Sequence, residues 1–150
     1  MNILITGAKG FVGRNLAETL KTIRDGKNRT RNLTIGEIYE YDIDTDPALL
    51  EEFCSKADFV FNLAGVNRPV DVKEFYEGNT DFSKNLLDTL AAKGNKAPVV
   101  VSSSIQAALA NPYGESKKAG EDLMFAYGKE MLTDAGNYEY DTSDMRKYVI

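Results

Sequence analysis

Short apolar runs alternate along this chain with longer stretches in which hydrophobic residues recur every three or four positions. An unbroken apolar run of a few residues is typical of a buried strand, and the longer spacing is typical of an amphipathic helix. The pattern predicts strands at 2–6, 35–43, 59–63 and 97–104. It predicts helices that run to about Arg24, begin at Pro47, cover 79–93 before Gly94, and run from Pro112 to about Met131.

Strands that alternate with helices form right-handed βαβ units, which place the strands in a parallel sheet. We therefore expect an α/β fold with a doubly wound parallel sheet, helices on both faces, and one domain over 1–150. The runs at 59–63 and 97–104 lack polar alternation, which predicts burial on both faces. Ligands of such sheets bind beyond the carboxyl ends of the strands. Four segments should gather there, at 7–13, 42–44, 63–68 and 102–104.

The first of these segments holds three glycines, Gly7, Gly10 and Gly13, between an apolar run and helical sequence. Gly7 would allow a turn with φ angles that a Cβ forbids. Gly10 would let a pyrophosphate approach the backbone, and Gly13 would let the helix pack close to the strand. The helix N-terminus offers N–H groups and partial positive charge to a phosphate. The segment predicts dinucleotide binding, with a glycine-rich turn that binds no ligand as the alternative.

Composition narrows the function classes. The chain is 43% hydrophobic and 27% charged, which is ordinary for a soluble globular protein. Its net charge of −5 gives no support to nucleic-acid binding. The absence of histidine removes the commonest general base and argues against a metal site. Cys54 is the only cysteine, which fits a reducing cytoplasm, and we expect neither a signal peptide nor a membrane span.

Tyr113 and Lys117 are four residues apart in the last predicted helix and therefore share one face. Gly120 continues that face and would allow close packing against the sheet. Residues 102–104 are serines that end the strand just upstream, at the expected ligand edge. An ammonium beside a phenol favours the phenolate, which makes tyrosine usable as a general acid or base near neutral pH. The pattern predicts a catalytic site, with a core tyrosine and a solvated lysine as the alternative.

A resemblance to the extended short-chain dehydrogenase/reductase superfamily, the NAD-dependent epimerases and dehydratases, rests on TGAKGFVG, NLAGVN, Asn79, SSS and YGESK in this order. Similarity to bacterial capsular-polysaccharide reductases that act on UDP-linked 4-keto-6-deoxy-N-acetylhexosamines rests on LAGVNRP and SSSIQAALANPYGESK. The resemblance implies a Rossmann-type domain of a cytoplasmic enzyme. It also implies hydride transfer with NADP(H) by preference or NAD(H), a UDP-linked amino sugar as substrate, and a homodimer or other self-association.

The resemblance implies roles for single residues as well. Ser104 would hydrogen-bond the substrate keto oxygen, Tyr113 would donate a proton to it, and Lys117 would hold the nicotinamide ribose. Cofactor contacts are implied for the three glycines, for the N–H groups of Phe11 and Val12, and for Lys9, Asp42, Leu63, Ala64 and Gly65. Substrate contacts are implied for Asn67, Arg68, Asn79 and Ser104.

Several of these roles have alternatives. Asn79 could be a plain helix cap, and Arg68 could be an ordinary loop arginine. Asp42 could bind the adenine ribose or touch adenine as the aspartate of the next strand. Lys9, with Arg29 and Arg31 in the loop before the second strand, favours a 2′-phosphate on that ribose, whereas Asp42 favours a 2′-hydroxyl.

The chain departs from the family pattern in two places. Residues 25–34 form an enlarged basic loop, and residues 131–150 form an atypical tail in which Tyr138 to Asp144 could pair along a sheet edge. The substrate domain that follows in the family is absent, so we expect the chain alone to bind dinucleotide weakly and not to turn over a UDP-sugar. The other functions to weigh are an epimerase or dehydratase that recycles its cofactor, and a truncated, non-catalytic nucleotide-binding or assembly module.

Overall fold

The computed structural model describes residues 1–29 and 32–133. The chain divides into two compact units. Residues 1–64 and 89–99 make the first unit, and residues 65–88 with those from 100 onward make the second. Arg31 and the segment from Tyr138 to Asp144 lie outside the described residues.

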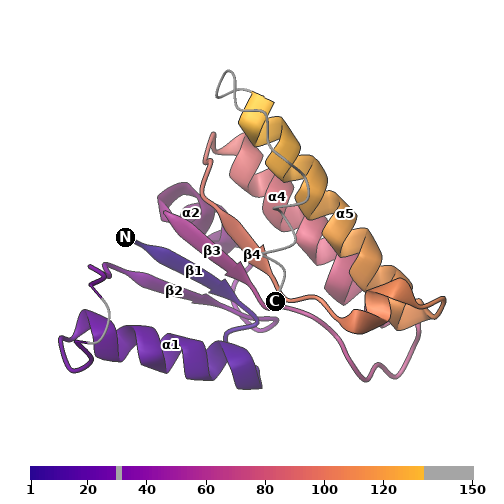
Figure 1. Ribbon diagram of the computed structural model, residues 1–150, viewed down its shortest axis with the longest axis horizontal. Coiled ribbons are helices and arrows are strands. Elements are labelled where there is room, and N and C mark those ends of the chain that lie inside the picture. The colour runs from indigo at the N-terminus through magenta and orange to yellow at the C-terminus, as the bar shows by residue number, and fades with distance from the viewer. Residues whose placement is uncertain (30–31, 134–150) are drawn as a thin grey trace. The chain divides into compact units, whose positions relative to one another are not determined.

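The described elements follow one another as alternating strands and helices. The first five are β1 (Ile3–Thr6), α1 (Phe11–Arg24), β2 (Ile38–Tyr41), α2 (Ala48–Lys56) and β3 (Phe59–Asn62). The next six are α3 (Lys73–Tyr76), a π-helical turn (Glu77–Asp81), α4 (Phe82–Ala92), β4 (Val99–Val101), a 3-10 turn (Ile105–Ala108) and α5 (Pro112–Thr133). The sheet has the order β2-β1-β3-β4, and β1 runs parallel to both β2 and β3 (Figure 1).

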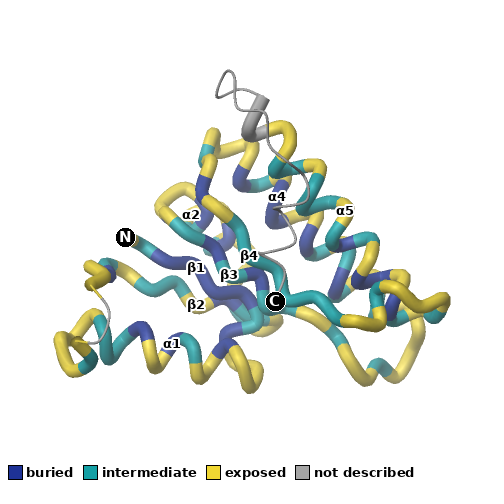
Figure 2. The backbone as a smooth tube through the Cα atoms, viewed as in Figure 1, coloured by how far each residue is buried: buried dark blue, intermediate teal, exposed yellow. Residues whose placement is uncertain are grey.

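The core of the first unit is built around β1, in which all four residues are buried (Figure 2). Because side chains alternate along a strand, Ile3 and Ile5 share one face. They lie in a buried cluster with Ala17 and Leu20 of α1. Leu4 points to the opposite face and is 0% exposed. Burial on both faces is why β1 appears in the sequence as an unbroken apolar run.

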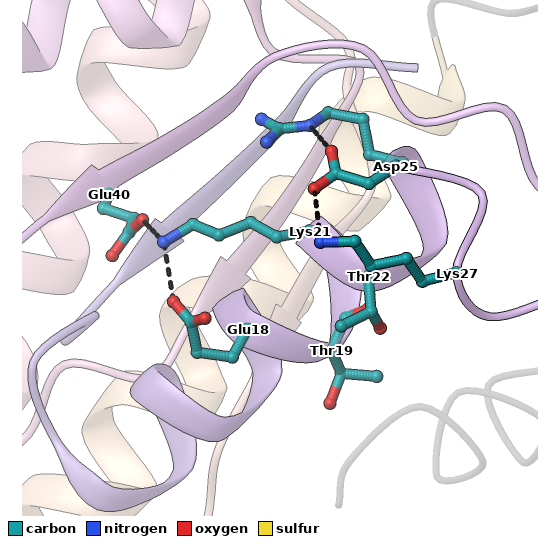
Figure 3. Close-up of polar contacts among 8 residues, drawn as sticks. Glu18, Thr19, Lys21, Thr22, Asp25, Lys27 and Glu40 are labelled. Carbon is teal, nitrogen blue, oxygen red and sulfur yellow. Dashed lines mark hydrogen bonds and ion pairs between the residues drawn. The ribbon is translucent and has the colours of Figure 1, made fainter.

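Lys21 joins α1 to β2 within the first unit (Figure 3). Its Nζ lies 2.8 Å from a carboxylate oxygen of Glu18 and 2.7 Å from one of Glu40. The hydrogen bonds from Glu18 and then Glu40 raise the pKa of Lys21. The three side chains are partly exposed, so this network orients α1 more than it stabilises the unit.

Two predicted strands are shorter than the sequence pattern suggests. The strand expected at 35–43 covers only Ile38–Tyr41. After Tyr41, the N–H of Asp42 donates to Thr45 Oγ1 and the N–H of Thr45 donates to the Asp42 carbonyl, both at 2.9 Å. These two bonds close a turn that ends β2. The strand expected at 97–104 covers only Val99–Val101.

The expected burial of the later strands on both faces is wrong in part. In β3, Val60 and Asn62 are buried but Phe59 and Phe61 are half-buried. All three residues of β4 are half-buried, and β4 stands last in the order of the described strands. A strand at the end of a sheet has a paired neighbour on one side only, which leaves its side chains more accessible.

Helical structure in the second unit begins earlier than predicted. The sequence places a helix start at residue 79, but the chain is helical from Lys73 through the π-helical turn into α4. The sequence pattern did not predict this earlier start, because Gly78 lies in the segment and glycine weakens a helical pattern. A Cβ on Gly78 would lie 2.5 Å from Val66 Cγ2, so the turn packs closely on the Val66 side chain.

The end of α4 and the start of α5 lie where the sequence predicts them. Gly94, with a φ of 64°, follows the last turn of α4. At the start of α5, Asn111 Oδ1 accepts the N–H of Gly114 at 2.8 Å, as a cap before Pro112 should. Within the described residues, no helix combines the length and the hydropathy needed to cross a bilayer.

Candidate functional site

The glycine turn between β1 and α1 is closely packed against the end of β3. Gly7 has a φ of 66°, and a Cβ on it would lie 2.7 Å from both the Leu63 carbonyl carbon and the Ala64 nitrogen. A Cβ on Gly13 would clash with the Gly7 carbonyl oxygen and would lie 2.8 Å from Ala8 Cα. Both positions therefore require glycine, and the turn leaves the start of α1 facing outward.

The start of α1 offers backbone donors beside that turn. The helix begins at Phe11, and the first N–H groups of any helix lack partners within it. The side chains of Phe11 and Val12 are 87% and 60% exposed. A Cβ on Gly10 would lie 3.2 Å from the Gly7 carbonyl oxygen, which is a tight contact, so the turn favours glycine at this position. Small residues and free donors at a helix start fit a dinucleotide pyrophosphate.

Thr6 and Asn62 form a buried polar pair at the carboxyl ends of β1 and β3. Thr6 Oγ1 donates to Asn62 Oδ1 at 2.6 Å and accepts the N–H of Ala64 at 3.3 Å. Both side chains are 0% exposed. The pair fixes Ala64 beside the glycine turn. Sequence reasoning missed it, although a polar residue closing each of two apolar runs was a usable signal.

Asp42 lies beside the glycine turn, as the ligand-edge argument predicts. Its Oδ2 accepts the N–H of Lys9 at 2.7 Å, and its Oδ1 accepts the N–H of Ile43 at 2.8 Å. The Nζ of Lys9 forms an ion pair with Asp44. The predicted segments 7–13 and 42–44 therefore meet in the first unit, together with Leu63 and Ala64.

Lys117 is buried in the second unit, where only 9% of it is exposed. Its Nζ donates to the carbonyl oxygen of Ser102 at 3.2 Å and lies 5.9 Å from the centre of the Tyr113 ring. Burial lowers the pKa of Lys117. A Cβ on Gly65 would lie 3.0 Å from this Nζ, so the Gly65 backbone passes directly beside it. The alternative of a solvated lysine is wrong.

Tyr113 is half-buried in the first turn of α5. Its ring packs against the ring of Phe75, with centres 5.4 Å apart and planes at 57°. Next to Phe75, the hydroxyl of Tyr76 donates to Glu115 at 3.1 Å. The two contacts hold α3 against the start of α5, and neither was predicted from the sequence.

Asn79 is held by four hydrogen bonds in the π-helical turn and is 4% exposed. Its Oδ1 accepts the N–H of Val66 at 3.0 Å, and its Nδ2 donates to the Val66 carbonyl at 3.2 Å and to Ser116 Oγ at 3.0 Å. Its own carbonyl accepts from Ser83 Oγ at 2.8 Å. The cap alternative is wrong, because Asn79 lies inside a helical segment and its side chain holds the loop after Gly65.

Gly120 has a different neighbour from the one expected. A Cβ on it would lie 3.3 Å from the Asn79 carbonyl oxygen, so this glycine faces the π-helical turn rather than the sheet. The spacing along α5 predicted a close approach correctly, but it could not say which segment approaches.

The three serines have three separate contacts. The Ser102 carbonyl serves Lys117, Ser103 Oγ donates to the carboxylate of Glu121, and Ser104 Oγ accepts the N–H of Gln106 at 3.2 Å as the cap of the 3-10 turn. Glu121 was missed by sequence reasoning, although it continues the spacing of Tyr113 and Lys117 by four residues. Asn67 and Arg68 are exposed in the loop before α3.

Comparison with known proteins identifies the family of this chain. A model of the NAD dependent epimerase/dehydratase family matches residues 3–140. The chain belongs to this family. This match confirms the predicted superfamily.

Two similar proteins are named as capsular or sugar-nucleotide proteins. The chain is 37% identical over 131 residues to a UDP-2-acetamido-2,6-beta-L-arabino-hexul-4-ose reductase of Pseudomonas aeruginosa, covering 87% of this chain and 32% of the relative. It is 44% identical to the capsular polysaccharide assembling protein CapF of Staphylococcus aureus, with a TM-score of 0.67, covering 88% of this chain and 33% of that structure. The chain thus spans about a third of the length of these relatives.

More distant structures of the family share the fold. A UDP-glucuronic acid 4-epimerase from Bacillus cereus, solved in complex with NAD, is 21% identical and has a TM-score of 0.64, with 88% of this chain and 54% of that chain covered. Together with the parallel strands, the structural likeness to CapF confirms the predicted α/β, Rossmann-type fold class.

Proposed function

We propose that this chain is the cofactor-binding part of a reductase that transfers hydride from NAD(P)H to a UDP-linked 4-keto-6-deoxy-N-acetylhexosamine in capsular or surface polysaccharide biosynthesis. The observation that carries the proposal is the buried Nζ of Lys117, 5.9 Å from the Tyr113 ring and close to the Gly65 backbone. Burying an ammonium costs free energy, so a function is the best reason for keeping it there. The substrate class comes from the named reductase relative.

The chain's own residues would divide the chemistry between them. A bound nicotinamide cofactor would supply the hydride for the carbonyl carbon. Tyr113 donates its phenolic proton to the keto oxygen, which completes the alcohol. Lys117 uses one of its three N–H donors on the Ser102 carbonyl, which leaves two for a ribose hydroxyl and for the tyrosine oxygen. Ser104 orients the keto oxygen with its hydroxyl hydrogen, because its oxygen accepts from Gln106.

The residues assigned to substrate divide into two kinds. Arg68 and Asn67 are exposed, and the guanidinium of Arg68 suits a sugar-nucleotide phosphate. Asn79 uses both amide protons on Val66 and Ser116, so we assign it to positioning the Gly65–Val66 loop beside Lys117. Self-association as a homodimer stays a prediction.

Two other functions differ from this proposal in what they do with the cofactor. The family description covers epimerases and dehydratases, which would recycle the cofactor. These would release no oxidised cofactor, whereas a reductase consumes one NAD(P)H per sugar. A non-catalytic nucleotide-binding module would bind cofactor and leave Tyr113 without effect on any reaction.

The test compares Tyr113→Phe with Tyr76→Phe in a form of the protein that carries a substrate-binding region. Tyr113→Phe should lower reduction of a 4-keto UDP-sugar by about 10²–10⁴-fold and leave cofactor binding intact, because only the proton donor is lost. Tyr76→Phe removes a neighbouring hydroxyl that bonds Glu115 and should keep most activity. Turnover by Tyr113→Phe at the wild-type rate would refute the assignment.

A further inference from the structure

Glu121 of α5 accepts a hydrogen bond from Ser103, in the segment that follows β4. The Ser103 hydroxyl is the donor and a carboxylate oxygen of Glu121 is the acceptor, and both residues belong to the second unit. Both are half-buried, so water competes less for this contact than for one on the open surface. A hydrogen bond to an ionised carboxylate is stronger than one between neutral groups. The chemistry assigned above to Tyr113, Lys117 and Ser104 does not use this pair.

Lys117 and Glu121 bind neighbouring residues of the serine segment, which we define as residues 102–104. The two side chains lie four residues apart in α5 and therefore share one face of the helix. The Nζ of Lys117 donates to the Ser102 carbonyl at 3.2 Å, whereas Glu121 accepts from the Ser103 hydroxyl. The helix thus holds the segment at two successive residues, through one donor and one acceptor.

The two contacts act on one peptide unit. The Ser102 carbonyl and the Ser103 nitrogen belong to the same planar group, which turns as a whole about its Cα atoms. The Cα of Ser103 is one end of that group, and the side chain on it is bonded to Glu121. Holding this side chain therefore restricts rotation of the carbonyl that Lys117 uses. If the carbonyl turned away, the buried ammonium would lose this acceptor, which is costly away from water.

Two other acids of α5 have different surroundings. Glu115 accepts from the Tyr76 hydroxyl, and Asp122 pairs with Lys118. The side chains of Lys118 and Asp122 are both more than half exposed, so their ion pair stabilises the helix little. Asp122 is next to Glu121 in the chain, which makes it a matched control for removal of one carboxylate charge.

We propose that Glu121 is a positioning residue, which by accepting the Ser103 hydroxyl fixes the peptide that carries the Ser102 carbonyl and so holds the Lys117 ammonium where it can bind a ribose hydroxyl. Glu121 acts through Lys117 and needs no contact of its own with cofactor or substrate. The inference rests on the proposed function, because that function supplies the ribose. The restraint on Lys117 is measurable without any ligand.

The first experiment observes the Nζ group of Lys117 by NMR, in the 150-residue chain labelled with ¹⁵N-lysine. A buried, hydrogen-bonded ammonium exchanges its protons slowly and gives a separate signal, which Lys117→Met identifies by its loss. Glu121→Met should shift and broaden this signal, because the acceptor at Ser102 is no longer fixed. Ser103→Ala removes only the donor hydroxyl and should have the same effect. Glu121→Gln should keep the signal, because its amide oxygen still accepts from Ser103.

The second experiment compares NADH, which carries the nicotinamide ribose, with ADP, which lacks it. Glu121→Met and Ser103→Ala should each weaken NADH binding by about three- to tenfold, the size of one hydrogen bond, and change ADP binding by less than about twofold. The double variant should lose no more than either single variant, because both remove the same bond. Asp122→Asn should leave both affinities and the Lys117 signal unchanged.

Circular dichroism checks that each variant folds, and Ser103→Ala decides alone if Glu121→Met does not fold. An unchanged Lys117 signal in Ser103→Ala overturns the inference. Loss of the signal in Glu121→Gln also overturns it, since the charge and not the hydrogen bond would then hold Lys117. Equal weakening of NADH and ADP overturns it as well, because that is the result of a general loss of packing. Failure of the wild-type chain to bind either ligand overturns the proposed function, while the NMR comparison still decides the restraint on Lys117.

Discussion

The Nζ of Lys117 donates to the carbonyl oxygen of Ser102 at 3.2 Å, across 15 residues of chain. An ammonium is thus held in a buried position by an uncharged acceptor, which offsets only part of the cost of removing it from water. The same contact attaches the end of β4 to α5 in the second unit. Lys117 therefore aligns the serine segment with Tyr113 at some cost in stability.

Replacing Lys117 with methionine should stabilise the chain at pH 7, because the buried charge disappears and the apolar stem remains. Burial lowers the pKa of Lys117, so the folded state holds this proton less tightly than the unfolded state does. The stability deficit of wild type relative to the variant is therefore complete below the lowered pKa. It disappears as pH rises toward the ordinary lysine value of about 10.4.

Urea unfolding of wild type and Lys117→Met at pH 7 and pH 10 checks this expectation. Lys118→Met is the matched control, since Lys118 is exposed and pairs with Asp122 on the same helix. It should show no gain at pH 7. A Lys117→Met variant less stable than wild type at pH 7 would mean that the Ser102 contact outweighs the desolvation.

Asn79→Ala should destabilise the chain by about 2–3 kcal/mol, because it leaves the Val66 N–H and carbonyl and Ser116 without their buried partner. Asn67→Ala, at an exposed site of the same loop, should change the free energy of unfolding by less than about 0.5 kcal/mol. Denaturant unfolding followed by circular dichroism measures both. Equal effects from the two substitutions would show that the Asn79 contacts add nothing to stability.

Gly7→Ala and Gly26→Ala separate two reasons for glycine. Gly26 has a φ of 71° with nothing within 4 Å of its Cβ position, so alanine there should cost only the left-handed strain of about 1–2 kcal/mol. Gly7 has a similar φ, but alanine would also press on the backbone of Leu63 and Ala64 at 2.7 Å. Thermal unfolding should show a clearly larger loss for Gly7→Ala. Similar losses would mean that β3 moves away from the turn freely.

Cys54 should react with a thiol reagent only when the chain unfolds. Its side chain is 0% exposed, and burial raises its pKa to about 12, so little thiolate exists at pH 8. Native protein should react slowly with a disulfide reagent followed by absorbance, and urea-unfolded protein should react at once. Rapid reaction of the native chain would contradict the burial of Cys54 within the first unit.

The sequence alone determined the features that depend on neighbours within a few residues. The glycine turn could be predicted because Gly7 and Gly13 lie too close together for a Cβ on Gly13. A Cβ there would clash with the Gly7 carbonyl oxygen. Tyr113 and Lys117 were recognisable because four residues make one helical turn. The apolar run at 2–6 predicted the strand β1.

Only the tertiary structure decided contacts between distant residues. Asp44 pairs with Lys9 across 35 positions, Thr6 bonds Asn62 across 56, and Asn79 binds Ser116 across 37. The π-helical turn and the facing of Gly120 toward Asn79 likewise depend on which segment packs nearby. Hydrophobic periodicity reports how far each position is buried but not against what, because burial is non-directional whereas hydrogen bonds and ion pairs need a particular partner at a particular place.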